Sequence, residues 1–407
     1  MTRVEEDSAV ESAASAEVEA RLHSLLIVRP TLAQGGADRV TITLLESLDR
    51  SVVDPSLALF RREGVYLDRV PDDVELLILG ARSLWTAWWP LAKHIRRHSP
   101  DIVFSTCSGT NVALCIAGLL TGGQSRLVLS ERNVLFRDQP LLKKWLIIAA
   151  KRLLYRAADC VTAVSTGVAD DLTAYLRVEP HRIRTVYNPI VGSELEQLAA
   201  ENVPDMAPAA GDPLILAAGR LVPAKGFDVL LDAFAVVNHH LPARLVILGE
   251  GPQRDNLERR AADLGLADRI FLPGFVRNPL SYMARCDVFA LSSRHEGLPG
   301  VLIQAMACGA AVVATDCHAG PREIISNGAD GLLIPVDDSR KMASALLDLL
   351  QNPQLRQRLG AAARQSVARF QRKAVVADYL DALIGALPPS PGNASGPRSS
   401  PGTVNPN

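Results

Sequence analysis

The chain has 407 residues, of which 48% are hydrophobic and 21% charged, and its formal net charge is −1. This composition is globular, and the length predicts about two domains of ordinary size. Because the charges balance, a broadly basic nucleic-acid-binding surface is excluded, and any attraction to an anionic surface must come from a local patch.

The two ends of the chain differ in composition from the rest. Residues 1–20 are acidic and rich in small side chains, whereas a secretion signal needs a basic start and an apolar core. Residues 389–407 are rich in Pro, Gly and Ser. We therefore expect a disordered leader and a disordered tail. No apolar run reaches the roughly 18 to 20 residues that span a bilayer, so the sequence predicts no integral membrane protein.

Between the tails, short β-branched runs alternate with amphipathic stretches, as in a parallel sheet covered by helices. The first set of strand candidates runs through LHSLLIVRP, LALFRRE and VELLILG to IRTVYNP, and the second runs from LILAAGR to GLLIPV. We predict an α/β fold with two doubly wound Rossmann-like domains that face a central cleft. The predicted parts are an N-terminal domain at 21–195, a C-terminal domain at 211–370, and a helix at 371–388 that packs back towards the N-terminal domain.

The cysteines indicate the redox environment. No two of the six form a CxxC pair, and their neighbours are mostly apolar. This pattern is typical of reduced thiols in a cytoplasmic protein and not of a disulfide framework or a zinc site. The six are Cys107, Cys115, Cys160, Cys286, Cys308 and Cys317.

The stretch SRHEGLPGVLIQAMACG, residues 293–309, follows a predicted buried strand. Pro299 suits the first position of a helix, and the free N–H groups of Gly297–Gly300 form an anion-receptive edge beneath Glu296. The Glu296 carboxylate can accept hydrogen bonds from sugar hydroxyls, and helical spacing directs Gln304 towards the cleft. A simpler alternative is that Glu296 caps the helix and Gln304 is a buried amide.

Two more segments carry signals for phosphate at matching strand ends. AAGRLVPAKGFDVLLDAF places Arg220 and Lys225 five residues apart in a loop before a helix, where two fixed cations could hold a diphosphate. QGGADRV places Gly35 and Gly36 at the first strand-helix junction, where glycine lets the backbone approach a ligand closely.

These segments, together with GPREII and NGADGLLIPVDD, resemble glycosyltransferase family 4, the retaining sugar-nucleotide enzymes of GT-B type. The resemblance runs from about residue 24 to 370. It implies a hexosyltransferase-type enzyme whose C-terminal domain binds the nucleotide sugar and whose N-terminal domain holds the acceptor. No DxD motif is present to hold a metal, and we expect neither a metal nor another cofactor.

The resemblance assigns roles to individual positions. Arg220 and Lys225 stand where the family neutralises the donor diphosphate, on which charge collects as the anomeric bond breaks. Glu296 stands where the donor sugar's hydroxyls are contacted. The expected donor-binding positions are Gly35 and Gly36 in the glycine loop, Gly297, Leu298, Pro299 and Gln304 after the strand, and Val276 and Asn278 near the base.

One position departs from the family pattern, in which a second Glu follows the first after seven residues and takes the ribose hydroxyls. Gln304 occupies that position here. Its carbonyl can accept hydrogen bonds from a ribose, but it lacks the charge that makes such bonds about twice as strong. We expect weaker donor affinity or a different nucleotide pose, and no loss of chemistry.

The acceptor side is predicted from the N-terminal domain. SERN ends a predicted buried strand on the cleft side, so Glu131, Arg132 and Asn133 are candidate acceptor contacts, although a plain polar turn is an alternative. Residues 126–156 hold eight basic and two acidic side chains, a local balance of +6.

Within this basic stretch lies a predicted amphipathic helix, residues 141–156. A helical wheel places Lys144 and Lys151 on one side and Trp145 at the flank. Such a helix suits anionic membrane or a polyprenyl diphosphate, whereas the alternative is a core-packed helix with a solvated face. The predicted apolar side holds Leu142, Leu146, Ala149 and Leu153, and the other tryptophans are Trp85, Trp88 and Trp89.

Three functions fit these patterns. The leading one is a retaining transfer from a UDP- or GDP-sugar to a glycan or polyprenyl-diphosphate-linked acceptor, in bacterial surface or exopolysaccharide assembly at the inner face of the plasma membrane. A sugar-nucleotide epimerase of the same fold is an alternative, which incubation with a UDP-sugar and no acceptor would distinguish. A non-catalytic subunit is suggested by Gln304 alone, and Arg220, Lys225 and Glu296 argue against it.

Overall fold

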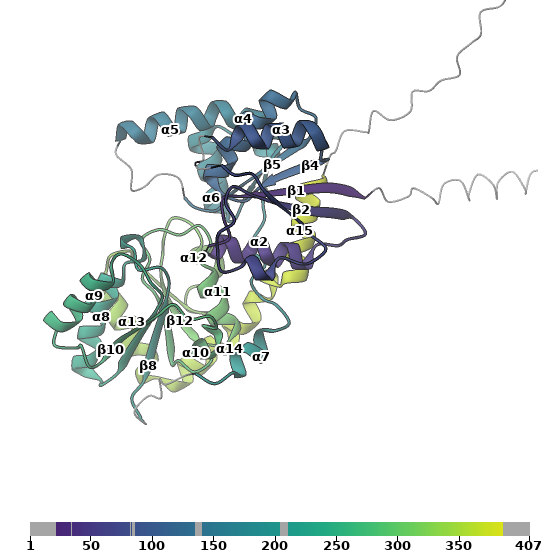
Figure 1. The fold of residues 1–407 in the computed structure, drawn as a ribbon. Helices are drawn as coiled ribbons and strands as arrows, with labels where there is room; N and C mark the ends of the chain where they lie inside the picture. The colour runs from purple at the N-terminus through teal and green to yellow at the C-terminus, as the bar shows by residue number, and fades with distance from the viewer. Residues whose placement is uncertain are drawn as a thin grey trace, which may run out of the picture.

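The structure of the protein, a computed structural model, contains two α/β units that lie one above the other in Figure 1, each built on a parallel sheet. The predicted fold class is therefore confirmed. The expected leader and tail, and Trp85, lie outside the described residues. These are 22–33, 35–81, 83, 86–134, 141–203 and 211–385, without the side chains of 141–144.

The N-terminal sheet has seven parallel strands in the order β3-β2-β1-β4-β5-β6-β7. The chain order reverses between β1 and β4, and in open α/β sheets the crevice beyond such a point is where ligands bind. The strands are β1 (His23–Arg29), β2 (Val53–Leu59), β3 (Glu75–Ile78), β4 (Ile102–Ser105), β5 (Arg126–Glu131), β6 (Cys160–Ala163) and β7 (Ile183–Thr185).

The C-terminal sheet has six parallel strands in the order β10-β9-β8-β11-β12-β13. Its order reverses between β8 and β11, so the loops that follow these two strands meet at the same crevice. The strands are β8 (Leu214–Ala218), β9 (Arg244–Leu248), β10 (Ile270–Gly274), β11 (Val288–Leu291), β12 (Ala311–Thr315) and β13 (Leu332–Ile334).

Helices cover the faces of both sheets, as the apolar strands require, because a parallel sheet is buried on both sides (Figure 1). In the N-terminal unit they are α2 (Gly36–Ser47), α3 (Trp88–His98), α4 (Ser108–Thr121), α5 (Leu141–Leu154) and α6 (Thr166–Asp171), and α7 (Leu195–Ala200) follows them. The later helices are α8 (Phe227–His240), α9 (Arg254–Asp263), α10 (Leu280–Met283), α11 (Gly300–Ala307), α12 (Pro321–Ile324), α13 (Ser339–Gln351), α14 (Pro353–Ser366) and α15 (Arg372–Ile384).

Strand β2 begins earlier than the sequence predicts. The segment LALFRRE predicted a strand from Leu57, whereas β2 begins at Val53 and includes Pro55, a residue that cannot donate to a ladder. In the structure Pro55 lies opposite Leu25 of β1, but β3 pairs only with residues from Ser56 onward. The proline is therefore accommodated where β2 has a neighbour on one side only.

The C-terminal helix α15 packs on the N-terminal unit. Its Tyr379 is fully buried and meets Phe104 of β4 edge to face, with ring centroids 6.0 Å apart. The two chain crossings between the units lie side by side, because Val191 and Gln371 form a β-bridge and Arg372 forms an ion pair with Glu194. Both crossings therefore fix how the two sheets face each other.

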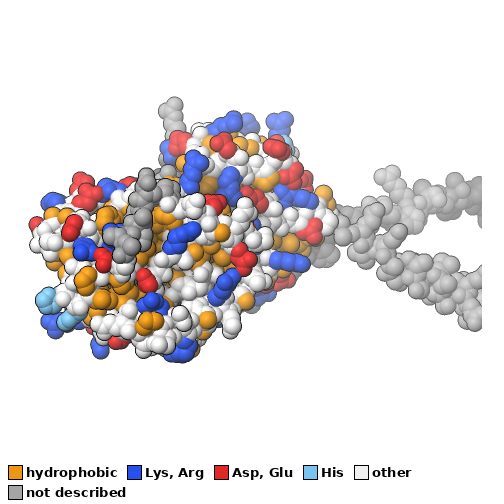
Figure 2. Space-filling view, turned by 90° about the horizontal axis from the view of Figure 1, so that it is seen from below, with side chains coloured by type: hydrophobic (Ala, Val, Ile, Leu, Met, Phe, Trp, Pro, Cys, Tyr) orange, Lys and Arg blue, Asp and Glu red, His pale blue; other side chains and the backbone are white. Residues whose placement is uncertain are grey.

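The charged side chains are mixed on the face that Figure 2 shows. Basic and acidic groups are interspersed there, and hydrophobic side chains gather mainly in one half of the view. This surface fits the net charge of −1. Attraction to a charged partner therefore depends on local groups, and not on a field over this whole face.

Candidate active site

The turn after β8 and the turn after β11 bring a lysine and a glutamate together at the switch point of the C-terminal sheet. Nζ of Lys225 lies 2.5 Å from Oε1 of Glu296, and Ser293 Oγ donates to the same oxygen over 2.6 Å. The Lys225 side chain is 21% exposed and that of Glu296 is 9% exposed. The pair is therefore partly desolvated and still reachable by a ligand.

The start of the Glu296 turn is held from the neighbouring strand. Ser293 O accepts hydrogen bonds from Thr315 Oγ1 over 2.5 Å and from Cys317 Sγ over 2.9 Å. Burial raises the pKa of Cys317 to about 11, so this thiol keeps its proton and remains a donor at neutral pH. These two hydrogen bonds therefore restrain the backbone segment that carries Glu296.

Arg220, the other cation that we predicted to bind the donor, lies five residues before Lys225 but has a different environment. Arg220 is exposed, and its side chain makes no hydrogen bond or ion pair to any residue that the structure describes. Gln304 of α11 is only 7% exposed, and no described residue bonds to its amide. Both groups retain their hydrogen-bonding capacity for a ligand, and their predicted roles stay predictions.

The two positions predicted near the base lie after β10. Val276 packs on the hydrophobic core. Asn278 Nδ2 donates to Leu198 O over 2.7 Å and to Glu201 over 2.8 Å, so its amide ties this loop to the segment that joins the two units. This contact gives Asn278 a structural role that the sequence did not indicate, and the contact with a base stays a prediction.

The loop that follows Glu296 lies directly against the N-terminal unit. A Cβ atom on Gly297 would lie 2.0 Å from Arg132 O, so only glycine fits here. Pro299 is the N-cap residue of α11, so the helix begins at Gly300, one residue later than we expected. The predicted donor loop and the predicted acceptor turn therefore share one boundary of the cleft.

The glycine loop of the N-terminal unit is ordered by charge. Gly35 is the N-cap of α2, and its N–H donates to Asp38 over 3.0 Å. Asp38 in turn forms a buried ion pair with Arg29 at the end of β1. A Cβ on Gly36 would meet nothing within 4 Å, which leaves open space beside the start of the helix.

Arg132, whose backbone lies against Gly297, carries a largely buried positive charge. Its guanidinium donates to Asn188 Oδ1 over 2.9 Å and to the Tyr379 hydroxyl over 3.3 Å, and both partners are neutral. Burial lowers the pKa of Arg132, and Arg29 nearby lowers it further. A bound anion would relieve this unfavourable charge, which keeps Arg132 as a candidate acceptor contact beside the exposed Asn133.

Glu131 has a role that its position in SERN did not indicate. Its side chain is 1% exposed, and Oε1 lies 2.7 Å from Nζ of Lys151, which is 4% exposed. The same oxygen accepts hydrogen bonds from Ser108 and Asn111 over 3.1 and 3.3 Å, and from the Tyr155 hydroxyl. The carboxylate therefore joins α4 and α5 to the sheet, and a contact of Glu131 with an acceptor stays a prediction.

The helical wheel correctly separated Lys151 from the apolar side of α5, but the structure does not match the alternative of a core-packed apolar side. Lys151 is buried because Glu131 offers it a charged partner. The apolar side faces outward, with Leu146 64% exposed, Leu153 66% exposed and Ala149 exposed. Trp145 is 54% exposed beside them. The side chains of Leu142, Lys143 and Lys144 lie outside the described residues.

Two contacts across the cleft escaped prediction. The carboxylate of Glu323 accepts hydrogen bonds from the backbone N–H groups of Thr166 and Gly167 over 2.7 and 3.1 Å, at the start of α6. His318 Nε2 lies 3.0 Å from Asp171. Glu323 stands in the quoted GPREII segment, but its partners are 157 and 156 residues away, so no local pattern announces the contact.

All six cysteines are free, as predicted. Within the described parts of the chain, the His, Cys, Asp and Glu side chains form no group of three or more that could hold a metal ion. The helices of these parts also include none that combines the length and the apolar character needed to cross a bilayer.

Comparison with known proteins matches both halves of the chain to families. Residues 34–191 match Glycosyltransferase Family 4, and residues 200–366 match Glycosyl transferases group 1. A Campylobacter jejuni relative, N-acetylgalactosamine-N,N'-diacetylbacillosaminyl-diphospho-undecaprenol 4-alpha-N-acetylgalactosaminyltransferase, is 33% identical over 278 residues, which cover 67% of this chain and 73% of that protein. The lipopolysaccharide core biosynthesis glycosyltransferase LpsE of Rhizobium meliloti is 31% identical over 233 residues, 56% of this chain and 65% of LpsE.

Solved structures support the fold. The structure of HepE from Anabaena in complex with UDP and glucose superposes with a TM-score of 0.75 at 19% identity, covering 89% of this chain and 100% of HepE. This identity is too low to transfer more than the fold. The family matches at both halves and the close relative carry the assignment: the chain belongs to glycosyltransferase family 4, and it is a GT-B glycosyltransferase of hexosyltransferase type.

Proposed function

We propose that the protein is a retaining glycosyltransferase that moves a sugar from a UDP- or GDP-sugar to a lipid-linked glycan in bacterial surface polysaccharide assembly. The observation that carries the proposal is the Lys225–Glu296 pair, 2.5 Å apart at the switch point of the C-terminal sheet. The related Campylobacter enzyme is named for a diphospho-undecaprenol acceptor, and this favours a polyprenyl-diphosphate-linked acceptor here.

The chemistry of the pair fits the breaking of a sugar-diphosphate bond. A lysine ammonium has three N–H donors, so Lys225 can keep its bond to Glu296 and still donate to a diphosphate oxygen. Positive charge that is fixed in advance stabilises the leaving diphosphate as the bond lengthens. Glu296 then orients the donor sugar through its hydroxyls, and exposed Arg220 adds the second cation.

In this proposal the acceptor is held by the N-terminal unit. The Arg132–Asn133 turn touches the donor loop at Gly297, so an acceptor held there lies next to the donor sugar. Arg132 has only neutral hydrogen-bond partners and suits the phosphate of a lipid-linked acceptor.

The test begins with donors. A thermal-shift screen of UDP- and GDP-sugars should show stabilisation of about 2.7 kcal/mol at a ligand concentration 100 times its dissociation constant. UDP-glucose goes first, since it is bound in a solved HepE structure. Transfer to a polyprenyl-diphosphate glycan then gives a product whose anomeric configuration is read by NMR. Inverted configuration, or no stabilisation by any nucleotide sugar, contradicts the proposal. We expect transfer to survive a metal chelator.

We further propose that the protein is cytoplasmic and docks on the inner face of the plasma membrane through the α3–α5 layer, at the top of Figure 1. Trp89 on α3 is 63% exposed, and the exposed Lys93 and Arg97 follow it at helical spacing on the same side. Helix α5, which packs on α4 as α3 does, adds an exposed apolar side to the same layer. Amphipathic aromatic rings beside basic groups suit the interface of an anionic bilayer.

Flotation with anionic vesicles at low salt tests the membrane contact. Replacing Lys93, Arg96 and Arg97 with Gln should weaken binding by about 1 kcal/mol per charge. The control variant replaces exposed Arg259 of α9, which is not part of this layer, with Gln. Wild-type protein that fails to float would remove the membrane contact and leave the transfer reaction untouched.

A further inference from the structure

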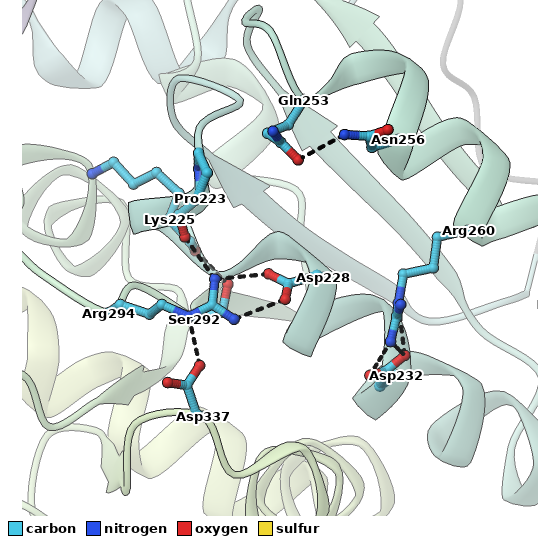
Figure 3. Close-up of polar contacts among 10 residues, drawn as sticks. All are labelled: Pro223, Lys225, Asp228, Asp232, Gln253, Asn256, Arg260, Ser292, Arg294 and Asp337. Atoms are coloured by element: carbon cyan, nitrogen blue, oxygen red, sulfur yellow. Dashed lines mark hydrogen bonds and ion pairs between the residues drawn. The ribbon is translucent and has the colours of Figure 1, made fainter. Parts of the chain in front are cut away.

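The turn that carries Lys225 is held entirely from the exit of β11. This turn, η5 (Pro223–Lys225), is a single 3₁₀ turn and has no sheet partner of its own. Its three successive carbonyl groups each accept a hydrogen bond from the neighbouring segment: Pro223 O from Arg294 Nη1 over 2.6 Å, Ala224 O from Arg294 N over 2.8 Å, and Lys225 O from Ser292 Oγ over 2.9 Å. Figure 3 shows the Arg294 and Ser292 side chains below Pro223 and Lys225.

Arg294 is itself clamped. Its guanidinium binds both carboxylate oxygens of Asp228 over 3.0 and 2.7 Å, and its Nε donates to Asp337 over 2.7 Å (Figure 3). With the bond to Pro223 O, four of its five N–H groups are engaged. Hydrogen bonding to Asp228 raises the pKa of Arg294, so the guanidinium stays charged.

Gly226, the residue after the turn, packs closely against the exit of β11. Gly226 has φ +60°, and a Cβ there would lie 2.1 Å from Ser292 O. The turn and the β11 exit are therefore in direct backbone contact. Because Glu296 follows Arg294 by two residues, one arginine fixes the backbone on both sides of the Lys225–Glu296 pair.

We propose that Arg294 is a positioning residue for Lys225: it holds the η5 turn so that the ammonium meets the donor diphosphate, and it does not touch the donor itself. The inference rests on the proposed function of Lys225. In Figure 3 the Lys225 side chain extends away from the Arg294 guanidinium. Arg294 therefore acts through the backbone of the turn, and a shift of about 1 Å in a catalytic group can slow a reaction roughly a hundredfold.

The chain supplies a matched control in the same hollow of about 350 Å³, which both arginines line. Arg260 of α9 binds both carboxylate oxygens of Asp232, as Arg294 binds those of Asp228 (Figure 3). Arg260 makes no bond to the η5 turn. Arg260→Gln thus removes a comparable ion pair and leaves the carbonyls of the turn bonded.

The experiment measures kcat and donor KM for Arg294→Gln and Arg260→Gln, each in the wild-type and the Lys225→Ala background. We expect Arg294→Gln to lower kcat roughly tenfold in the wild-type background and less than about twofold once Lys225 is gone, because coupled sites are not additive. Arg260→Gln should change kcat less than about twofold in either background. An equal loss from Arg294→Gln in both backgrounds overturns the inference.

Separate outcomes distinguish the inference from the proposed function. Wild-type turnover in Lys225→Ala means that the diphosphate site itself is wrong. A large loss in Lys225→Ala with unchanged turnover in Arg294→Gln removes only the positioning role. If Arg294→Gln does not fold, Asp337→Asn, which loosens the guanidinium but leaves its bond to Pro223 O, is measured in the same two backgrounds and should show the same dependence on Lys225.

Discussion

Each of the two units holds one lysine–glutamate pair, and the pairs differ in what surrounds them. Glu131 ends β5 and its lysine comes from α5, whereas Glu296 follows β11 and its lysine comes from the η5 turn after β8. The pair Lys151–Glu131 is 4% and 1% exposed, and the partners of Glu131 all belong to the same unit. The pair Lys225–Glu296 is 21% and 9% exposed and borders the cleft.

Both pairs consist of a lysine and a glutamate, so the difference in their expected roles comes from their burial. In the inner pair, each charge has only protein partners, so removing one leaves the other desolvated and unpaired. In the cleft pair, a ligand or water can take over a lost contact. We therefore expect the inner pair to control stability and the cleft pair to control turnover.

The largest effect is expected from Lys151→Met. Breaking a buried pair by removing one partner costs about 3–5 kcal/mol, because an uncompensated carboxylate remains in the core. Denaturant unfolding should show this loss, whereas Lys225→Met should cost clearly less. The double variant Glu131→Gln with Lys151→Met should recover part of the stability. An equal loss for both lysines would abolish the distinction between the pairs.

The next effect concerns turnover. Lys225→Ala removes a fixed cation from the leaving diphosphate, which should cost roughly 3 kcal/mol of transition-state stabilisation, or about a hundredfold in kcat. Arg220→Ala should act in the same direction. Steady-state kinetics check both, with melting temperatures to show that the variants fold. Unchanged turnover in both folded variants would rule out this diphosphate site.

The sequence predicted more about the cleft pair than about the buried pair, and the reason is physical. Lys225 and Glu296 were expected at one site because short loops after buried strands constrain where their side chains can lie. The structure places them 2.5 Å apart, and their roles with a donor, like that of Arg220, stay predictions. The burial of Lys151 was not predicted, because a helical wheel gives the spacing of side chains and not the side that faces the sheet. Only the tertiary partner Glu131, 20 residues away, makes burial of a lysine favourable.

The residues that support the site could not be predicted from the local sequence pattern. Arg294 was quoted as part of the SRHEG turn without a role, since its side-chain partners Pro223, Asp228 and Asp337 lie 71, 66 and 43 residues away. The alternation of apolar strands and amphipathic helices predicted both sheets, because every parallel strand must be buried on two faces. The start of β2 was predicted too late, and Pro55 is tolerated in the strand because β3 pairs only from Ser56 onward.

The smallest effect is expected from Gln304→Glu. This variant tests whether Gln304 contacts a ligand in the cleft or only packs in the core. If the amide faces a ribose, the new carboxylate offers a charged acceptor, and donor KM should fall by several-fold, equivalent to roughly 1 kcal/mol. Gln304 is 7% exposed and no described residue bonds to its amide, so a ligand partner is open to it.

Burial opposes this gain. A carboxylate at position 304 with no ribose nearby would be desolvated, and its raised pKa would lower stability at neutral pH. Donor KM and the melting temperature of Gln304→Glu, each with and without nucleotide, separate the two cases, and Gln304→Met serves as the control of equal bulk without an acceptor. A stability loss that nucleotide does not recover would place Gln304 with the buried pair Lys151–Glu131, as a packing residue, and not with the cleft pair.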